Sequence, residues 1–334
     1  MFVEAIEAIL DDRCTPQVVR AIEGGASPAP LWNAISESGF LELLTPEARG
    51  GAGLSLDALF PVIECLGRYA VPVPVAQSIF ARAVLWSSGV AVPQGMMTFA
   101  AAYQPSGDGH MQCALTPYGS IADAVLSDQE GDLVLLSCAQ ARREPSGVHG
   151  SQCATLRWDR GVEPVARIAG GARVLHACGA VVHAALLAGA MSRVFAMTLR
   201  YANDRSQFGK PIGKFQAIQQ QLAVMAEQVA AATVAAELGF DAAGAVPDFL
   251  RAAMAKARTS EAVTSIAATA HAVHGAIGVT QEYDLQLFTR RLHEWRIAHG
   301  SEHYWNRVIG ETLLASGSGV SDFAREAAAS SSPS

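Results

Sequence analysis

The chain has 334 residues, half of them hydrophobic and 16% charged, and it carries a formal net charge of −7 at pH 7. This length allows two or three packed units with a large core, and the acidic balance argues against a nucleic-acid binder, which needs a basic face. Six cysteines without metal-ligand spacing predict reduced, buried thiols in a cytoplasmic protein.

The N-terminal part of the chain is helical in pattern. Its opening MFVEAIEAILDD is acidic and has neither the basic segment nor the cleavage site of a signal peptide. Residues 31–44 and 56–68 carry apolar side chains at helical spacing, and Ser55 is placed to cap the second helix. Two prolines within VPVPVAQS (71–78) interrupt the helices, because proline does not fit inside a regular helix.

The composition changes near Pro93. Short apolar runs separated by Gly, Asp, Ser and Pro predict the β-strands of a small sheet or barrel, and these runs lie at 97–103, 111–116, 123–128 and 132–137. The sequences GDG (107–109) and EGD (130–132) predict tight turns between strands.

The chain becomes rich in Ala, Leu, Met, Gln and Glu from about Gly171. Long helices are predicted there, at 172–203, 214–240, 247–277 and 284–296, with a last one after Gly300. The apolar stretch 177–199 is interrupted by His183, Ser192 and Arg193, so we expect a buried helix and no membrane span. The Ser/Ala-rich C-terminal tail is predicted to be frayed.

Helices, then strands, then a helical bundle constitute an α+β arrangement in which each block buries its own core. We therefore predict an N-terminal helical domain (1–92), a small β-domain (93–170), a C-terminal four-helix bundle (171–316) and a flexible tail (317–334).

The most informative segment of the bundle is RYANDRSQFGKPIGKFQAIQQQLAVM, which begins at Arg200. One helix closes around Arg205, a rigid turn with two glycines and a proline follows, and Phe215 restarts an apolar helical face. Such a turn places backbone amides and Arg205 where a phosphate-bearing ligand could bind. By this chemistry alone, a solvated loop is the more usual explanation of the arginine.

The string RxQFGxPIxxFQAIQ resembles the C-terminal signature of the acyl-CoA dehydrogenase family, and GFLELLTPEARGGAGL and HGAIGVTQEYDLQLFTRR resemble its N-terminal domain and a distal C-terminal motif. The resemblance spans the whole chain. It implies FAD as the cofactor, with its adenosine pyrophosphate contacted across a subunit interface. The implied contacts are Arg205, Gln207, Phe208 and Gly209 from the first string and Gly275 and Gly278 from the last.

The resemblance also shows where this chain departs from the family. The family's base, which removes the Cα proton of a thioester, is normally a glutamate, because burial can raise a carboxylate's pKa toward neutrality. His299 stands in the glutamate's place, and Ala180 stands at the alternative place known in some relatives. We expect His299 to be an inactive filler, although a histidine could act as a base near pH 7. Glu302 is the fallback base, if the backbone shifts.

The flavin-facing part of the β-domain departs from the family pattern too. Ala100 and Tyr103 replace the Tyr and Thr that usually contact the flavin, and Ala114 replaces a Trp. Thr116 is retained where a hydroxyl would face the flavin, and the resemblance implies a further FAD contact by Ser301.

Half of the FAD site is therefore kept and half is eroded, as in the short subunit of heteromeric (α₂β₂) bacterial acyl-CoA dehydrogenases of steroid side-chain degradation, which this chain resembles. The resemblance implies lipid or steroid degradation, an acyl-CoA substrate, a homologous partner subunit in a dimer or heterotetramer, and electron-transfer flavoprotein as electron acceptor. The leading hypothesis is a partner subunit that has no catalytic base of its own and binds FAD jointly with a second chain.

Three alternatives stay open: a self-sufficient acyl-CoA dehydrogenase with a displaced base, a flavin oxidase or monooxygenase acting on a non-CoA substrate, and a structural scaffold without FAD contact. No metal site is predicted, because His299 and His303 could share a helix face but have no evident third ligand.

Overall fold

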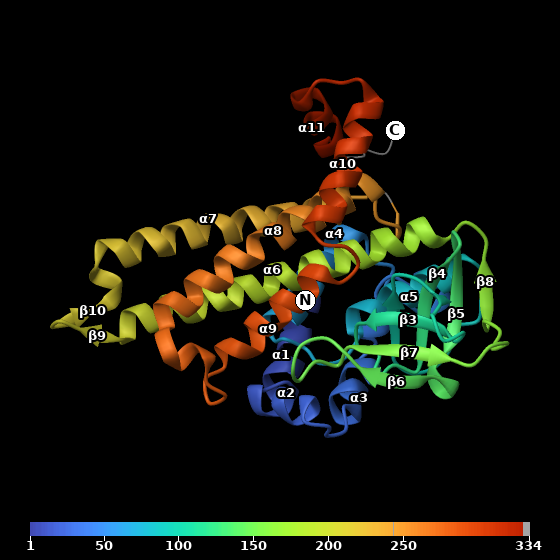
Figure 1. Cartoon of the computed structure of the whole chain (residues 1–334), viewed down its shortest axis with the longest axis horizontal. Coiled ribbons are helices and arrows are strands. Elements are labelled where there is room, and N and C mark those ends of the chain that lie inside the picture. The colour runs from blue at the N-terminus through green and yellow to red at the C-terminus, as the bar shows by residue number, and fades with distance from the viewer. Residues whose placement is uncertain (243, 330–334) are drawn as a thin grey trace.

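The computed structural model describes residues 1–242 and 244–329, which form a helical N-terminal part, a β-domain and a bundle of long helices (Figure 1). The predicted α+β architecture is confirmed. Helix α6 (Ala172–Asp204) runs through the centre of the bundle, and it packs against α4 (Leu56–Arg68), α7 (Gln216–Leu238), α8 (Phe249–His274) and α9 (Leu285–Ile297). Its position makes α6 the element on which the other parts of the molecule are assembled.

The N-terminal part consists of α1 (Phe2–Arg13), α2 (Pro16–Glu23), α3 (Ala29–Glu37), α4, α5 (Val75–Ser87) and the 3₁₀ turns Phe40–Glu42 and Glu47–Arg49. The helix predicted at 31–44 is broken, because Gly39 takes a left-handed conformation (φ 80°) after α3. Ser55 precedes α4 as predicted, but its side chain makes no capping hydrogen bond. Helices α4 and α6 touch through glycines: a Cβ on Gly189 would lie 1.9 Å from the Glu64 carbonyl oxygen.

The β-domain contains two four-stranded sheets with strand orders β1-β4-β5-β8 and β2-β3-β7-β6. Their strands are β1 (Met97–Ala100), β2 (Gln104–Pro105), β3 (Met111–Thr116), β4 (Ala124–Gln129), β5 (Asp132–Ser137), β6 (Arg142–Pro145), β7 (Ala154–Trp158) and β8 (Ala166–Ile168). The tight turn predicted at 130–132 is confirmed, since Glu130 and Gly131 both have positive φ between the antiparallel strands β4 and β5. The first predicted strand ends at Ala100, earlier than expected.

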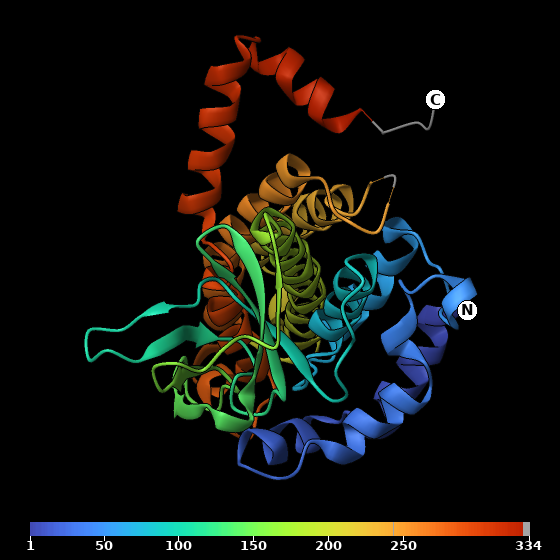
Figure 2. The same ribbon diagram turned by 90° about the vertical axis from the view of Figure 1, so that its right-hand side faces the viewer.

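The bundle continues with the short hairpin of β9 (Ser206–Gln207) and β10 (Lys210–Pro211), then α7, α8, the 3₁₀ turn Gly275–Val279, α9 and α10 (Glu302–Ser316). The tail predicted to be flexible from residue 317 instead contains helix α11 (Val320–Ala328), which turns back from α10 (Figure 2). Phe323 is buried, and the Arg251 Nε donates to the Ala327 carbonyl at 2.8 Å, so α11 is tied to α8. Residues 330–334 of the predicted tail lie outside the described residues.

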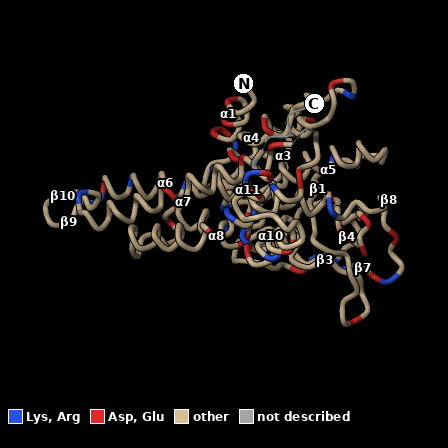
Figure 3. Tube along the Cα trace, turned by 90° about the horizontal axis from the view of Figure 1, so that it is seen from above, with Lys and Arg blue, Asp and Glu red and all other residues tan. Residues whose placement is uncertain are grey.

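Two helical segments, Ala172–Asp204 and Phe249–Val279, are long and apolar enough to cross a membrane by length and composition. The apolar window of α6 is 89% buried inside the protein, which is the behaviour of a core helix and agrees with the predicted buried helix. Figure 3 shows that charged residues are sparse along the outer bundle and that basic residues lie at its β9–β10 end.

Candidate functional site

The β9–β10 hairpin forms the outer tip of the bundle (Figure 1). Its two-residue turn consists of Phe208 (φ 52°) and Gly209 (φ 81°), both left-handed, as in the turns that suit short hairpins. A phenylalanine rarely takes this conformation. Phe208 is nevertheless 92% exposed, with only an edge contact to Phe215. The tip therefore carries an exposed phenyl ring on a residue whose backbone conformation is unfavourable.

Arg205 lies at the base of this hairpin, directly after α6. Its backbone N–H donates to Tyr201 at 2.8 Å and its carbonyl accepts from Ile212 at 2.8 Å, so its backbone is fixed. Ile212 packs in a small core with Ala202, Leu222 and Val273. The Arg205 side chain is exposed and takes part in no ion pair within the described part of the chain.

The second motif lies beside the first. Tyr201 stacks on His274 with ring centroids 4.5 Å apart, and the Tyr283 ring lies 5.2 Å from that of His274 and 6.2 Å from that of Tyr201. Gly275 then ends α8 with φ 65°, and a Cβ there would meet nothing within 4 Å, so its backbone faces open space. Gly278 is buried, and a Cβ on it would approach His274 at 3.0 Å, so this glycine serves packing. The structure thus brings the two predicted adenosine motifs to one end of the bundle.

His299 lies elsewhere, on the turn between α9 and α10, where β1 packs near α6. Its ring is 6.0 Å from the Phe99 ring and 5.1 Å from the His183 ring between centroids. A Cβ on Gly179 would lie 2.5 Å from the His299 ring, so the imidazole rests directly on the α6 backbone. Burial, and then the nearby His183, hold the pKa of His299 well below its ordinary value. Ala180 is also fully buried here, and no carboxylate replaces it.

A buried lysine underlies this turn. Lys256 of α8 has no exposed surface, and its Nζ donates to Ser260 Oγ at 2.7 Å, the Arg296 carbonyl at 2.7 Å and the Gly300 carbonyl at 2.9 Å. Burial lowers the pKa of Lys256 to about 7, against an opposing effect of Glu302. Nothing in the sequence points to Lys256 or His183 as members of this cluster, because only the fold places them beside His299.

Glu302, the fallback base, is engaged in an ion pair. Its Oε2 lies 3.0 Å from Arg296 Nε, and this hydrogen bond lowers the pKa of its carboxyl. A general base for a weakly acidic carbon needs the opposite shift. The geometry therefore describes Glu302 as a partner of Arg296 on the outer side of the turn.

The other predicted contacts do not meet in one cavity. The Thr116 hydroxyl is buried and donates to the Cys113 carbonyl at 3.1 Å, while Tyr103 is buried with its ring at 5.5 Å from that of Trp158. Ser301 is half-buried at the N-terminus of α10, without a capping hydrogen bond from its side chain. Within the described ranges no group of three or more His, Cys, Asp or Glu residues is placed to hold a metal ion.

The two halves of the candidate site are far apart. Gly179, under His299, and Arg205 lie on or next to the same straight helix, so at about 1.5 Å per residue they are separated by roughly 39 Å. One dinucleotide is too short to place its adenosine at Arg205 and its flavin at His299. The open, cationic tip fits the adenosine end of an FAD, whereas the surroundings of His299 are filled by protein.

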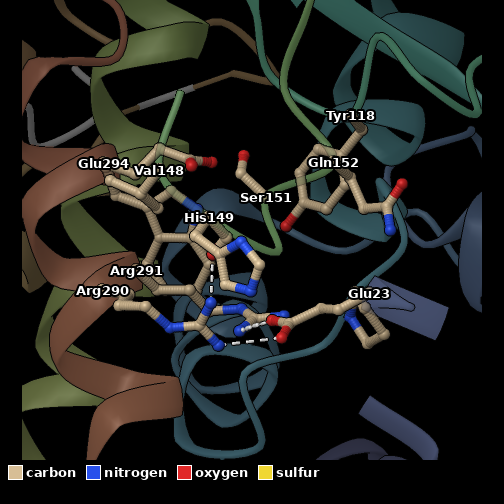
Figure 4. A pocket seen from close by; sticks show the side chains of 11 residues that line it. Glu23, Tyr118, Val148, His149, Ser151, Gln152, Arg290, Arg291 and Glu294 are labelled. Atoms are coloured by element: carbon tan, nitrogen blue, oxygen red, sulfur yellow. Dashed lines mark hydrogen bonds and ion pairs between the residues drawn. The ribbon is translucent and has the colours of Figure 1, made fainter. Parts of the chain in front are cut away.

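A polar junction between α2, the loop 146–153 and α9 is shown in Figure 4. The cavity of ≈ 20 Å³ there has room for about one water molecule. Glu23, which is 8% exposed at its side chain, lies 2.9 Å from Arg290 Nη2 and 2.5 Å from Arg291 Nη1. None of the predicted site residues lines this cavity, and we interpret it as a contact between parts of the fold.

Comparison with known proteins identifies the family of the chain. Residues 1–90 match the model of the acyl-CoA dehydrogenase N-terminal domain, and residues 174–314 match that of the acyl-CoA dehydrogenase C-terminal domain. The acyl-CoA dehydrogenase IpdE2 of Mycolicibacterium smegmatis is 30% identical over 307 residues, which cover 87% of this chain and 90% of that protein.

Solved structures with the same fold include a variant of the Tcur3481-Tcur3483 steroid ACAD (TM-score 0.80, 25% identity, covering 95% of this chain and 97% of that one). The ChsE4-ChsE5 complex from Mycobacterium tuberculosis is similar, with a TM-score of 0.79, 23% identity and coverage of 95% and 97%. The family-model matches and the relative at 30% identity show that the chain belongs to the acyl-CoA dehydrogenase family.

Proposed function

We propose that this chain is a partner subunit of an acyl-CoA dehydrogenase, one that completes the FAD site of a homologous chain and has no catalytic base of its own. The observation that carries the proposal is the separation of the two half-sites: an exposed Arg205 and Phe208 lie roughly 39 Å along α6 from the turn where His299 is buried. A cofactor whose adenosine is bound at the tip cannot reach the flavin position of the same chain. Its flavin must therefore be bound by a neighbouring chain.

The family consists of FAD-bound oxidoreductases, and the residues of the tip suit the adenosine half of this cofactor. Arg205 has a planar guanidinium free to bind pyrophosphate with two parallel hydrogen bonds. Phe208 offers an apolar face, and Gly275 lets a ligand approach the backbone closely. When bound, FAD supplies the acceptor for the hydride that leaves Cβ of the thioester. The residues of this chain hold and orient the cofactor.

Neither candidate base in this chain has the properties that the reaction needs. His299 is buried with a strongly lowered pKa, so it is a weak proton acceptor. Glu302 is held ionised by Arg296 and is likewise weakly basic. The proton of Cα is therefore taken by a base on the homologous chain.

The neighbours suggest the substrate class. Proteins with this fold include a steroid ACAD and a two-component complex, so we propose a CoA thioester of steroid or lipid origin, a heterotetramer, and electron-transfer flavoprotein as acceptor. We also propose a cytoplasmic location, in agreement with six buried, unpaired cysteines in the described structure.

Flavin retention tests the proposal. We expect the chain alone to purify without a visible flavin band, and the chain co-expressed with its homologous partner to hold flavin. Arg205→Ala should reduce the flavin absorbance per complex, whereas Arg193→Ala, an exposed arginine about 18 Å earlier on the same helix, should not. A flavin-loaded and active protein from this chain alone would contradict the proposal.

A further inference from the structure

His299 is held in a state that is unfavourable for a histidine. It is 7% exposed and its backbone is left-handed, with φ 53°. Neither of its ring nitrogens has a partner with hydrogen-bond geometry in the part of the chain that the structure describes, although the Phe99 backbone is close enough to oppose the lowering of the pKa of His299. Strained backbone and unsatisfied buried polar atoms destabilise a fold, and where both persist they often mark a functional requirement. A glycine would avoid both, so the imidazole ring itself needs an explanation.

The ring fills a space that three elements leave between them. Phe99 of β1 contacts it edge-on with an interplanar angle of 88°, and His183 of α6 faces it at 34°. Gly179 closes the floor, where even a methyl group would overlap the imidazole. We refer to this space, bounded by Phe99, Gly179 and His183, as the β1–α6 junction. The His299 ring lies against all three of these walls.

The turn that carries His299 is fixed on both sides of the ring. Trp305 Nε1 donates to the His299 carbonyl at 2.9 Å, and Lys256 Nζ donates to the Gly300 carbonyl at 2.9 Å. Both donors are buried, so their loss would not be compensated by water. The imidazole therefore cannot leave the junction by a rotation of the backbone without breaking these bonds.

We propose that His299 is a plug: it closes the β1–α6 junction and so excludes an acyl thioester from this chain's own counterpart of the catalytic site. This inference deepens the proposed function and rests on it. The chain then touches only the cofactor of its neighbour, because the space at its own junction is occupied by a side chain. His299 is thus a residue that determines which chain of an assembly carries the substrate.

A double-mutant cycle tests the packing. In the natural chain, Gly179→Ala places a methyl group 2.5 Å from the His299 ring and should lower the melting temperature. In the His299→Gly background the same alanine meets an empty space, and the loss should largely disappear. His299→Gly itself should fold, because glycine suits a left-handed backbone. An equal loss in both backgrounds would overturn the proposal.

Small-molecule binding tests the exclusion. Neutral imidazole should stabilise His299→Gly by filling the vacated space, with a melting temperature rise on the order of 3 °C at tenfold its dissociation constant. The natural chain and His299→Phe, which restores a ring of similar size, should not respond. Butyryl-CoA titrated into the isolated natural chain should give no binding heat.

Stoichiometric butyryl-CoA binding by the natural chain, lost in His299→Phe, would overturn the plug. Flavin retained by an Arg205→Ala complex would instead overturn the proposed function and leave the plug intact, because these measurements use the isolated chain.

Discussion

Lys256 lies in the protein interior, where three hydrogen bonds and the charge of Glu302 compensate for its lost hydration. Burial lowers its pKa to about 7 from an ordinary 10.5. Above about pH 7 the folded chain releases this proton while the unfolded chain keeps it, so this group makes stability rise with pH, by about 1 kcal/mol between pH 7 and 8. We expect the slope of stability against pH, measured by urea denaturation, to be more positive in the natural chain than in Lys256→Met by this amount. The buried cysteines titrate identically in both proteins, so a shared slope would contradict the assignment.

The buried histidines govern stability on the acid side. Burial lowers the pKa of His183 to about 3, and His299 is shifted in the same direction. As pH falls below about 6.5, these histidines bind protons in the unfolded chain but stay neutral in the folded chain. The free energy of unfolding therefore decreases as pH falls. We expect His299→Phe to remove about 1.4 kcal/mol per pH unit of this loss between pH 6 and 5, measured by urea denaturation. An unchanged slope in that window would show that His299 is protonated in the folded protein.

The Glu23 carboxylate is one of the groups that join helices α2 and α9. Glu23 bridges Arg290 and Arg291, and Gln152 Nε2 donates to the Ile22 carbonyl at 2.9 Å, so the N-terminal part, the β-domain and the bundle meet here (Figure 4). Glu23→Gln removes the carboxylate that both largely buried guanidinium groups contact, and leaves Glu294 as the nearby counter-charge of Arg291. We expect a loss of about 3 kcal/mol in the free energy of unfolding.

The control for this variant is Glu37→Gln, which alters an exposed carboxylate of α3 and should change stability by less than about 0.5 kcal/mol. Chemical denaturation of both variants gives the comparison. If the two losses are equal, the contact between α2 and α9 does not hold the parts of the fold together.

The spacing of apolar residues along the sequence predicted the helices and strands that depend mainly on contacts between residues close in sequence. The helices α4 and α6 and the strands β3 and β5 have apolar spacing that survives in the fold, and their predicted bounds are close to those observed. The strand β6 was not predicted, because all four of its residues are exposed and its sequence is polar. Helix α11 was missed because Arg251, 76 residues earlier in the chain, holds it.

In the candidate site, too, the contiguous motif was predicted from the sequence and the cluster assembled from distant segments was not. The motif around Arg205 and Phe208 is contiguous, so sequence alone located it, and the structure adds its exposure and its left-handed turn. The cluster around His299 is built from α6, α8 and β1, and its lysine is 44 residues from the carbonyl at Gly300 that it binds. No periodicity or spacing relates such residues, so Lys256 and His183 emerged only from the fold.

At the scale of the whole molecule, the bundle presents an outer surface that is poor in charge. Helix α7 carries no charged residue besides Glu227 and Glu237, and Val224 and Val234 are more than half exposed on it. A solvated helix face normally carries many charges, so this face is suited to burial against another subunit. A single charge placed there should oppose association without touching the core of this chain.

We therefore expect Val234→Arg to weaken assembly with the proposed homologous partner, because the new guanidinium would be buried without a counter-charge in the complex. Val234 is 57% exposed, so the isolated variant should melt within about 2 °C of the natural chain. Val165→Arg is the matched control, since Val165 is 65% exposed and precedes strand β8 of the β-domain. Light scattering coupled to gel filtration measures the assembled fraction, and flavin absorbance in the same run reports the shared site.

If both variants assemble to the same extent, the surface of α7 is not the contact with the partner. If only Val234→Arg loses both the partner and the flavin, cofactor binding and assembly depend on the same bundle.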